Sequence, residues 1–173
     1  MILNNQNIIL IGFMGVGKGT IARALVKNSD YFAVDTDDLI ESLENKKIKK
    51  IFEEEGEPYF RSIEKKCALW CESHLTSTII STGGGFYKQE NIKKIGTIIY
   101  LQSTFDKIIE GLHNAPNAKK KFKKRPLLND LDEAQKIYNQ RIKEYEEVSD
   151  IIINVENWDA EDAAFRILKE IKQ

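Results

Sequence analysis

The sequence predicts a three-layer α/β/α fold, in which a five-stranded parallel sheet lies between two layers of helices. Short apolar runs alternate along the chain with longer stretches of helical periodicity, an order of elements typical of a parallel sheet covered by helices. Several runs are apolar at consecutive positions, as expected for strands buried on both faces. The chain has 173 residues, of which 42% are hydrophobic, so it can form one core, and we expect a single domain over residues 1–173.

The expected elements follow one another without an internal repeat or a break in composition. Strands are predicted for the five apolar runs at residues 7–11, 31–34, 78–81, 97–101 and 151–155. Helical periodicity predicts long helices at residues 18 to about 28, 58 to about 74, 131 to about 147 and 160–171, and shorter helices after Asp37, Lys49 and Phe105. Residues 114–124 are polar and basic and lack periodicity, so we predict a mobile loop there.

Composition argues against several classes of function. The net charge of −1 argues against a protein that mainly coats nucleic acid. Cys67 and Cys71 share one face of a helix, but no nearby histidine or third cysteine completes a metal site, so reduced thiols are expected. No apolar run approaches the ~20 residues that cross a bilayer, and the N-terminus has no leader pattern. We therefore expect a cytoplasmic protein with no membrane or nucleic-acid partner.

A phosphate-binding loop follows the first strand. Residues 12–20 read Gly-Phe-Met-Gly-Val-Gly-Lys-Gly-Thr, which places the glycine and lysine positions of a P-loop between a strand and a helix. Glycines let backbone N–H groups turn towards a phosphate, the helix N-terminus adds a positive dipole end, and the lysine reaches the β- and γ-phosphates. The residues expected to contact the nucleotide are Gly15, Val16, Gly17, Lys18, Gly19 and Thr20.

Gly19 departs from the usual P-loop, in which a serine or threonine after the lysine offers its hydroxyl to Mg²⁺. Thr20 carries a hydroxyl, but it lies one position further along the helix, rotated by ~100°. Two possibilities follow for the Mg²⁺ that accompanies ATP. Either phosphates and water hold the ion, because Mg²⁺ often keeps several waters, or Thr20 takes a modified role as its ligand.

Three further segments carry charged residues or glycines that suit a ligand site. Residues 35–38, Asp-Thr-Asp-Asp, follow the second strand, where carboxylates point into the crevice in which open α/β sheets bind ligands. For Asp38, however, we favour a role as the cap of the next helix. Arg61 could bind a ligand or pair on the surface with a neighbouring glutamate, Glu57 or Glu64. Residues 83–85 are three consecutive glycines, which let a ligand approach bare main chain.

Taken together, these segments resemble the shikimate kinase family over nearly the whole chain. The resemblance rests on six segments in family-like order and spacing: Gly-Phe-Met-Gly-Val-Gly-Lys at 12–18, Asp-Thr-Asp at 35–37, Phe60-Arg61 with Glu64, Ser-Thr-Gly-Gly-Gly at 81–85, Arg-Pro-Leu-Leu at 125–128, and Arg141 with Tyr145. It implies a P-loop kinase fold of the nucleoside-monophosphate-kinase type, with an acceptor-binding helical segment at about 37–60 and a mobile lid at about 112–125. It also implies a monomer that phosphorylates shikimate with ATP, a step towards chorismate and the aromatic amino acids.

The same resemblance implies roles for individual residues. The catalytic residues would be Asp37, as base or orienter of the attacking hydroxyl, together with Lys18 and Arg125. The substrate-binding residues would be Asp37, Arg61, Gly83, Gly84, Gly85 and Arg141, with the two arginines clamping the shikimate carboxylate. Arg125 would also close over the nucleotide from the lid. Asp35 would face the Mg²⁺ shell through water.

Two observations keep other functions open. Gly111-Leu112 stands where the family has an arginine before a leucine that helps to hold adenine, so Arg125 or His113 would have to replace that contact. The Gly-Lys-Gly-Thr run at 17–20 also occurs in adenylate kinases. Another small-molecule P-loop kinase, with a nucleoside monophosphate or gluconate as acceptor, is therefore one alternative. A catalytically impaired nucleotide-binding module is the other, because of Gly19 and Gly111.

Overall fold

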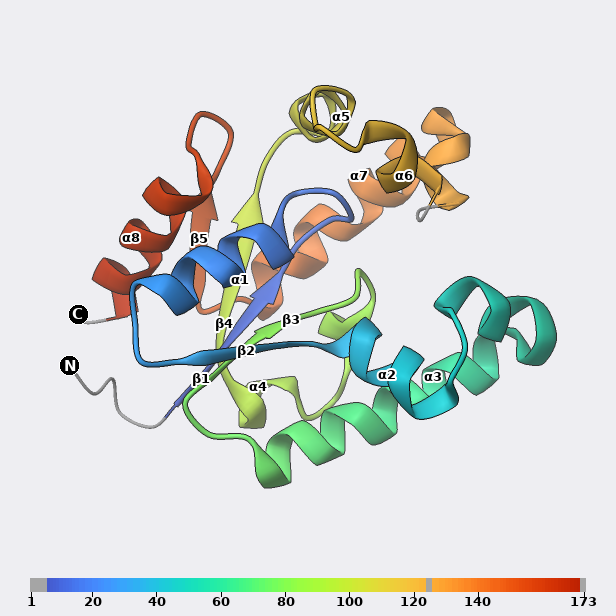
Figure 1. Cartoon of the computed structure of the whole chain (residues 1–173), viewed down its shortest axis with the longest axis horizontal. Coiled ribbons are helices and arrows are strands. Elements are labelled where there is room, and N and C mark those ends of the chain that lie inside the picture. The colour runs from blue at the N-terminus through green and yellow to red at the C-terminus, as the bar shows by residue number, and fades with distance from the viewer. Residues whose placement is uncertain (1–5, 124–125, 172–173) are drawn as a thin grey trace.

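The centre of the molecule is a sheet of five parallel strands in the order β2-β3-β1-β4-β5 (Figure 1). A computed structural model describes residues 6–123 and 126–171. In chain order the strands are β1 Asn7–Ile11, β2 Phe32–Asp35, β3 Thr78–Ser81, β4 Gly96–Gln102 and β5 Ile151–Asn154. The five strands lie within a few residues of their predicted positions, and the predicted parallel sheet is confirmed.

Helices cover both faces of this sheet. They are α1 Lys18–Lys27, α2 Thr36–Glu44, α3 Ile48–His74, α4 Ile92–Ile95, α5 Phe105–His113, α6 Ala118–Lys123, α7 Leu131–Val148 and α8 Ala160–Ile171, with 3-10 turns η1 Phe86–Lys88 and η2 Pro126–Asn129. Side chains of β1 alternate between two cores: Ile8 and Leu10 pack with α1 and α8, whereas Ile9 and Ile11 pack with α3, α5 and α7. Figure 1 shows α1 and α8 together in front of the sheet and α7 behind it. The predicted three layers are therefore confirmed.

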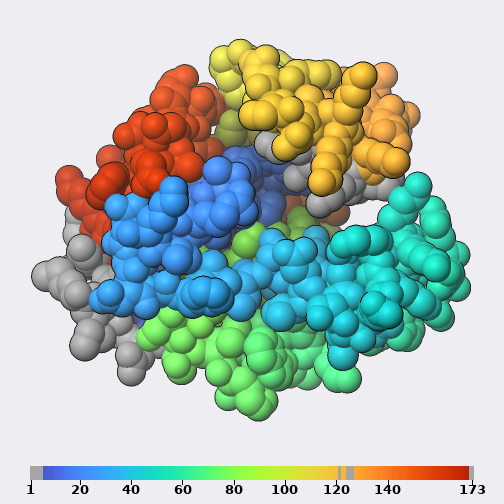
Figure 2. Space-filling model, viewed as in Figure 1, coloured from blue at the N-terminus to red at the C-terminus, as the bar shows by residue number. Residues whose placement is uncertain are grey.

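The strand order brings three loops to one edge of the sheet. The phosphate loop follows β1, the Asp35–Asp37 segment follows β2, and the three glycines follow β3. Because β2, β3 and β1 are neighbours and all run parallel, their carboxyl ends meet at this edge. In the space-filling view, α6 and the first part of α3 face each other across an open recess at the same side of the molecule (Figure 2).

The prediction of a loop over residues 114–124 is wrong for its second half, where α6 forms. Alanine and lysine are good helix formers, so local propensity permits this turn even though the segment lacks an apolar stripe. Its one aromatic side chain, Phe122, packs on the ring of His113 in α5, with 4.8 Å between ring centroids. Lys124 and Arg125, which end the predicted lid, lie outside the described residues.

Two predicted helices join in α3. Gly56, with φ of 82°, interrupts the helix between the segment after Lys49 and the longer segment that contains Pro58. Proline is tolerated here because the first turn of a helix does not use its backbone N–H groups. α3 is thus two helical segments joined at a glycine, and the first segment packs on α2 through Ile40 and Ile51.

The structure also bears on the cysteines, on metal-binding clusters and on membrane-spanning helices. Cys67 and Cys71 are free thiols one turn apart in α3, and Cys71 is buried. Within residues 6–123 and 126–171, no group of three histidine, cysteine, aspartate or glutamate side chains could hold a metal ion. Over the same residues, no helix has both the length and the apolar character needed to cross a bilayer.

Candidate active site

The phosphate loop arches between β1 and α1. Gly15 has φ of 89°, and a Cβ there would lie 2.7 Å from Leu112 Cδ1, so only glycine fits. Gly17 precedes α1 with φ of 108°. Lys18 is buried, and its Nζ donates to the carbonyl oxygens of Gly12 at 2.6 Å and Phe13 at 3.1 Å. The ammonium group therefore lies against the loop that phosphates would occupy.

Thr20, in the first turn of α1, is hydrogen-bonded within its own helix. Its exposed hydroxyl accepts a hydrogen bond from Arg23 Nη2 at 3.3 Å, one turn further along α1. Gly19 leaves space, because a Cβ built on it would meet only Arg23 Nη1, at 3.7 Å. The structure thus gives Thr20 a partner within its own helix.

Asp35 caps the N-terminus of α2. Its Oδ1 accepts from the backbone N–H groups of Asp37 at 2.9 Å and Asp38 at 3.3 Å, and its Oδ2 accepts from the Ser81 hydroxyl at 2.7 Å. The expectation that Asp38 caps this helix is wrong, because β2 runs one residue further than predicted and the helix starts at Thr36. Both oxygens of Asp35 already accept hydrogen bonds, which suits contact with an ion through water better than direct ligation.

Three candidate site side chains converge on the three glycines after β3. Each glycine lies against a different charged side chain, and the three side chains come from α2, α3 and α7. A Cβ built on these glycines would lie 2.5 Å from Asp37 Oδ1 at Gly83, 3.2 Å from Arg141 Nη1 at Gly84, and 2.7 Å from Arg61 Nη1 at Gly85. Asp37, Arg61 and Arg141 are 24 and 80 residues apart in the sequence (61 − 37 and 141 − 61), and the fold brings them around one short turn.

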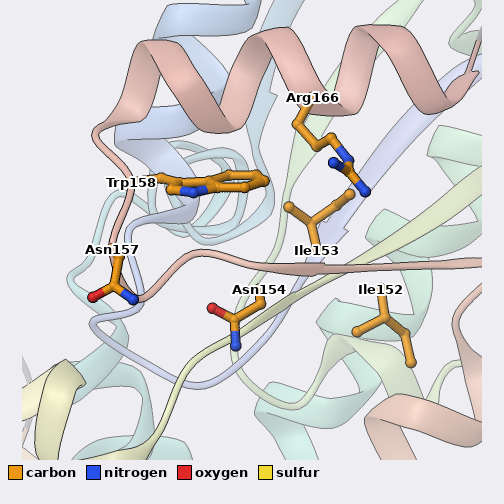
Figure 3. A pocket seen from close by; sticks show the side chains of 6 residues that line it. All are labelled: Ile152, Ile153, Asn154, Asn157, Trp158 and Arg166. Atoms are coloured by element: carbon orange, nitrogen blue, oxygen red, sulfur yellow. The ribbon is translucent and has the colours of Figure 1, made fainter.

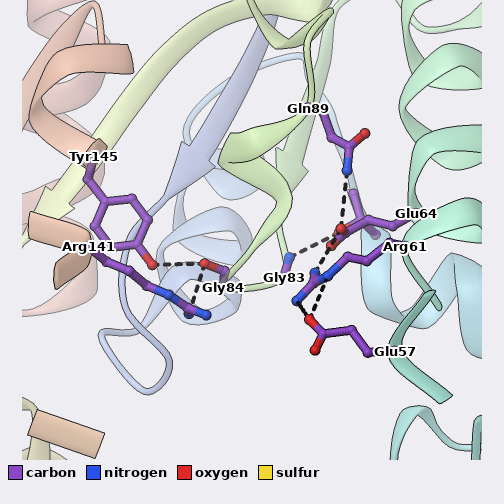
Figure 4. A network of polar contacts seen from close by, with 9 residues as sticks. Glu57, Arg61, Glu64, Gly83, Gly84, Gln89, Arg141 and Tyr145 are labelled. Carbon is purple, nitrogen blue, oxygen red and sulfur yellow. Dashed lines mark hydrogen bonds and ion pairs between the residues drawn. The ribbon is translucent and has the colours of Figure 1, made fainter. Parts of the chain in front are cut away.

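Hydrogen bonds fix the turn in this position. Gly83 N donates to the hydroxyl of buried Thr36 at 3.0 Å, which ties the turn to the start of α2. On the other side, the Gly84 carbonyl accepts from Arg141 Nη1 at 3.2 Å and from the Tyr145 hydroxyl at 2.9 Å (Figure 4). Donors and acceptors from α2 and α7 therefore hold the main chain of the glycines.

Arg61 is oriented by two carboxylates. Its guanidinium pairs with Glu57 at 2.9 Å and with buried Glu64 at 2.9 Å, and Gln89 donates to the same Glu64 oxygen at 3.1 Å (Figure 4). Both pairings considered from the sequence are present, and they hold the arginine beside Gly85. No sequence signal pointed to Gln89, which lies outside the motifs, and Tyr145 had no role assigned.

Burial raises the pKa of the Asp37 carboxyl to about 7, with a further contribution from the negative charge of Asp35, while Lys18 acts in the opposite direction. A carboxyl group that titrates near neutral pH can exchange a proton with a substrate under physiological conditions. Such a shift in a crevice beside a phosphate loop is typical of functional sites.

The residues discussed above for adenine binding, Gly111 and His113, lie in α5 beside Leu112. A Cβ built on Gly111 would meet nothing within 4 Å, whereas Leu112 packs against Gly15. His113 directs its ring to Phe122 of α6. Arg125, expected to act on the nucleotide, lies outside the described residues.

A cavity of about 320 Å³ lies elsewhere, between β5 and α8 (Figure 3). It is lined by Ile152, Ile153, Asn154, Asn157, Trp158 and Arg166. Arg166 is engaged with Glu170 at 2.9 Å and lies over the Trp158 ring. None of the candidate site residues lines this cavity, so it is separate from the glycine turn.

Comparisons with known proteins show the family of the chain. Residues 14–172 match the family model described as shikimate kinase. A shikimate kinase of Helicobacter hepaticus is 38% identical over 149 residues, which is 86% of each chain. The structure of shikimate kinase from Acinetobacter baumannii in complex with shikimate superposes with a TM-score of 0.85 at 30% identity, covering 98% of this chain and 94% of that one. That of shikimate kinase from Aquifex aeolicus gives a TM-score of 0.76 at 30% identity, with 96% of each chain covered. The chain therefore belongs to the shikimate kinase family.

Proposed function

We propose that this protein transfers the γ-phosphate of ATP to the 3-hydroxyl of shikimate, giving ADP and 3-phosphoshikimate in the biosynthesis of chorismate and the aromatic amino acids. Membership of the shikimate kinase family supports this activity. The observation that carries the acceptor site is the convergence of Asp37, Arg61 and Arg141 on three glycines beside the phosphate loop. One carboxylate and two guanidinium groups match the hydroxyls and the carboxylate of the acceptor.

Arg61 and Arg141 bind the shikimate carboxylate. They stand at adjacent glycines, Gly85 and Gly84, so both can reach one small anion. A guanidinium offers paired N–H donors in the plane of a carboxylate, which fixes the direction of the ring as well as its position. The bonds from Glu57 and Glu64 keep Arg61 in place before the acceptor arrives.

Asp37 takes the proton of the 3-hydroxyl. Because its pKa is about 7, a large fraction of Asp37 is ionised at neutral pH and can accept this proton. The hydroxyl oxygen bonds to the γ-phosphorus, the bond from phosphorus to the β,γ-bridging oxygen breaks, and ADP leaves with that oxygen. In its ionised form Asp37 also orients the hydroxyl for this in-line attack.

Lys18 and Arg125 supply most of the positive charge that neutralises the phosphoryl group during transfer. On ATP binding, the Lys18 ammonium exchanges the carbonyls of Gly12 and Phe13 for β- and γ-phosphate oxygens. The loop of Gly15 to Thr20 surrounds the phosphates with backbone N–H groups. Arg125 approaches from the lid at about 112–125, which closes with the acceptor-binding segment at about 37–60 and excludes water.

Mg²⁺ fits this site as an ion held by the nucleotide and by water. Asp35, with both oxygens hydrogen-bonded, would accept hydrogen bonds from its water shell, and the Thr20 hydroxyl would stay with Arg23. When bound, the ion neutralises charge on the β- and γ-phosphates.

The cytoplasmic location and the monomeric state stay predictions. Sedimentation velocity would test the monomeric state.

A coupled assay of ADP release with Mg-ATP tests the function. We expect strong stimulation by shikimate and none by AMP or gluconate, the acceptors of the alternative kinases. Stimulation by either control acceptor would reassign the substrate. If ATP raises the melting temperature while no acceptor stimulates ADP release, the chain is a nucleotide-binding module without this activity.

A further inference from the structure

The carbonyl oxygen of Gly84 accepts two hydrogen bonds from α7. Arg141 Nη1 donates at 3.2 Å and the Tyr145 hydroxyl at 2.9 Å (Figure 4). The two residues are four positions apart, so they extend from one face of the helix to the same atom. A carbonyl oxygen has two lone pairs, and these two donors use both of them.

Arg141 has two partners in the proposed reaction. In the structure its Nη1 donates to the Gly84 carbonyl, and in the acceptor complex the other N–H groups of the guanidinium can donate to the shikimate carboxylate at the same time. The Gly84 carbonyl therefore fixes the position from which the guanidinium reaches the acceptor. A displaced carbonyl would move the guanidinium and misalign its donors with the carboxylate.

We propose that Tyr145 is a positioning residue for the kinase reaction, whose hydroxyl holds the Gly84 carbonyl in the place from which it orients Arg141 towards the acceptor carboxylate. The inference rests on the proposed role of Arg141. Tyr145 thereby holds the glycine turn in one conformation before and after the acceptor binds, so that the Arg141 guanidinium stays aligned with the acceptor carboxylate.

The surroundings of Tyr145 suit a donor that stays in place. Its side chain is 1% exposed, and its ring packs on Tyr87 at 4.5 Å and Tyr100 at 5.2 Å between centroids. Burial raises the pKa of Tyr145 to about 12, so the hydroxyl keeps its proton and donates throughout the physiological range. Arg141, in contrast, has a long flexible stem and is only half-buried.

Tyr87 provides a matched control. It belongs to the same aromatic cluster and is also buried, but its hydroxyl donates to Glu144 and not to Gly84. Tyr87→Phe and Tyr145→Phe each remove one hydroxyl from the same core and keep both rings. A general effect of the cluster would therefore be common to both variants, whereas support of Gly84 belongs to Tyr145 alone.

The test compares the shikimate Kd by calorimetry, the KM for each substrate and kcat for the wild type and both variants. We expect Tyr145→Phe to raise the shikimate Kd and KM about fivefold to tenfold, with kcat within about twofold and the KM for ATP unchanged. Tyr87→Phe should leave all four constants unchanged. In an Arg141→Met background, Tyr145→Phe should no longer reduce kcat/KM for shikimate, because no guanidinium is left for the Gly84 carbonyl to orient.

Other results would overturn the proposal. An unchanged shikimate Kd in Tyr145→Phe, whatever its melting temperature, would leave the hydroxyl a structural role only. An equal rise of the shikimate Kd in Tyr87→Phe would assign the effect to the aromatic cluster. If the wild type binds ATP but not shikimate, the proposed function itself fails and this inference fails with it, an outcome distinct from a wild type that binds shikimate normally.

Discussion

Asp37 combines a raised pKa with a position at the glycine turn, where we propose that the reacting hydroxyl binds. If it accepts the proton, kcat/KM for shikimate should fall below pH ~7, because the protonated carboxyl cannot act as base. Asp37→Asn should lower kcat by roughly 10²–10⁴-fold and remove this acid limb. Asp38→Asn, a neighbouring exposed carboxylate, is the control and should keep the wild-type profile.

The same shift has an effect on stability with the opposite direction from most carboxylates. Because the pKa of Asp37 is higher in the folded protein than its ordinary 3.8, the folded state binds the proton more tightly, and ionisation above pH ~4 lowers the free energy of unfolding until pH ~7. Asp37→Asn should therefore have a free energy of unfolding about 1–3 kcal/mol higher than the wild type at pH 8, and the difference should be smaller at pH 5. Urea denaturation at the two pH values measures this difference. A variant that is less stable at pH 8 would contradict the burial of a charged carboxylate.

Substitutions at Gly19 and Thr20 test how the protein holds Mg²⁺. A serine Cβ has room there, with Arg23 Nη1 at 3.7 Å, so Gly19→Ser should fold normally. The new hydroxyl can bind Mg²⁺ directly, and we expect the Mg²⁺ concentration for half-maximal activity to fall severalfold. Thr20→Ala should leave that concentration unchanged, because its hydroxyl is directed to Arg23. A large rise in Thr20→Ala would instead make Thr20 the ligand.

Substitutions in the glycine turn after β3 can test the proposed roles of Asp37 and Arg61 separately. A methyl group at Gly83 would press on Asp37 Oδ1 and should lower mainly kcat, whereas one at Gly85 would press on Arg61 Nη1 and should raise mainly the KM for shikimate. Gly111→Ala is the control: its methyl group meets nothing, so both constants should be unchanged and helix α5 should gain about 0.5–1 kcal/mol. Equal effects of Gly83→Ala and Gly85→Ala on kcat and KM would mean that the whole turn is displaced.

The elements themselves show how far local sequence determines this fold. β1, β3 and α8 have the predicted bounds because buried apolar runs and a periodic apolar face are strong local signals. The turns η1 and α4 are too short to show any period, and α6 has no apolar stripe, so nothing local distinguishes them from loops. The same limit applies to the site. The P-loop is a contiguous motif and can be recognised in the sequence, whereas the contact of Gln89 with Glu64 forms only in the tertiary structure.

The proposed acceptor site depends on the topology of the entire chain. Nothing in the spacing of Asp37, Arg61 and Arg141 predicts that they meet; the resemblance to a family supplied their association, and the sheet order β2-β3-β1 supplies its physical reason. The proposed nucleotide and acceptor sites therefore share one edge of a single sheet. The charge of Lys18, in the phosphate loop, lowers the pKa of Asp37 at the glycine turn.

This shared edge predicts that the two ligands stabilise the molecule cooperatively. Each ligand alone at about 100 times its Kd should add about 2.7 kcal/mol to the free energy of unfolding. If the lid and the acceptor-binding segment close only over both ligands, ADP and shikimate together should raise the melting temperature by more than the sum of their separate shifts. Differential scanning calorimetry gives the melting temperature with ADP alone, with shikimate alone and with the two ligands together. ADP is used in place of ATP because it allows no turnover.

Arg61→Met is the matched variant, because it should remove the shikimate shift and the excess while keeping the shift from ADP. Strictly additive shifts in the wild type would show that the sites fill independently and that no joint closure accompanies binding.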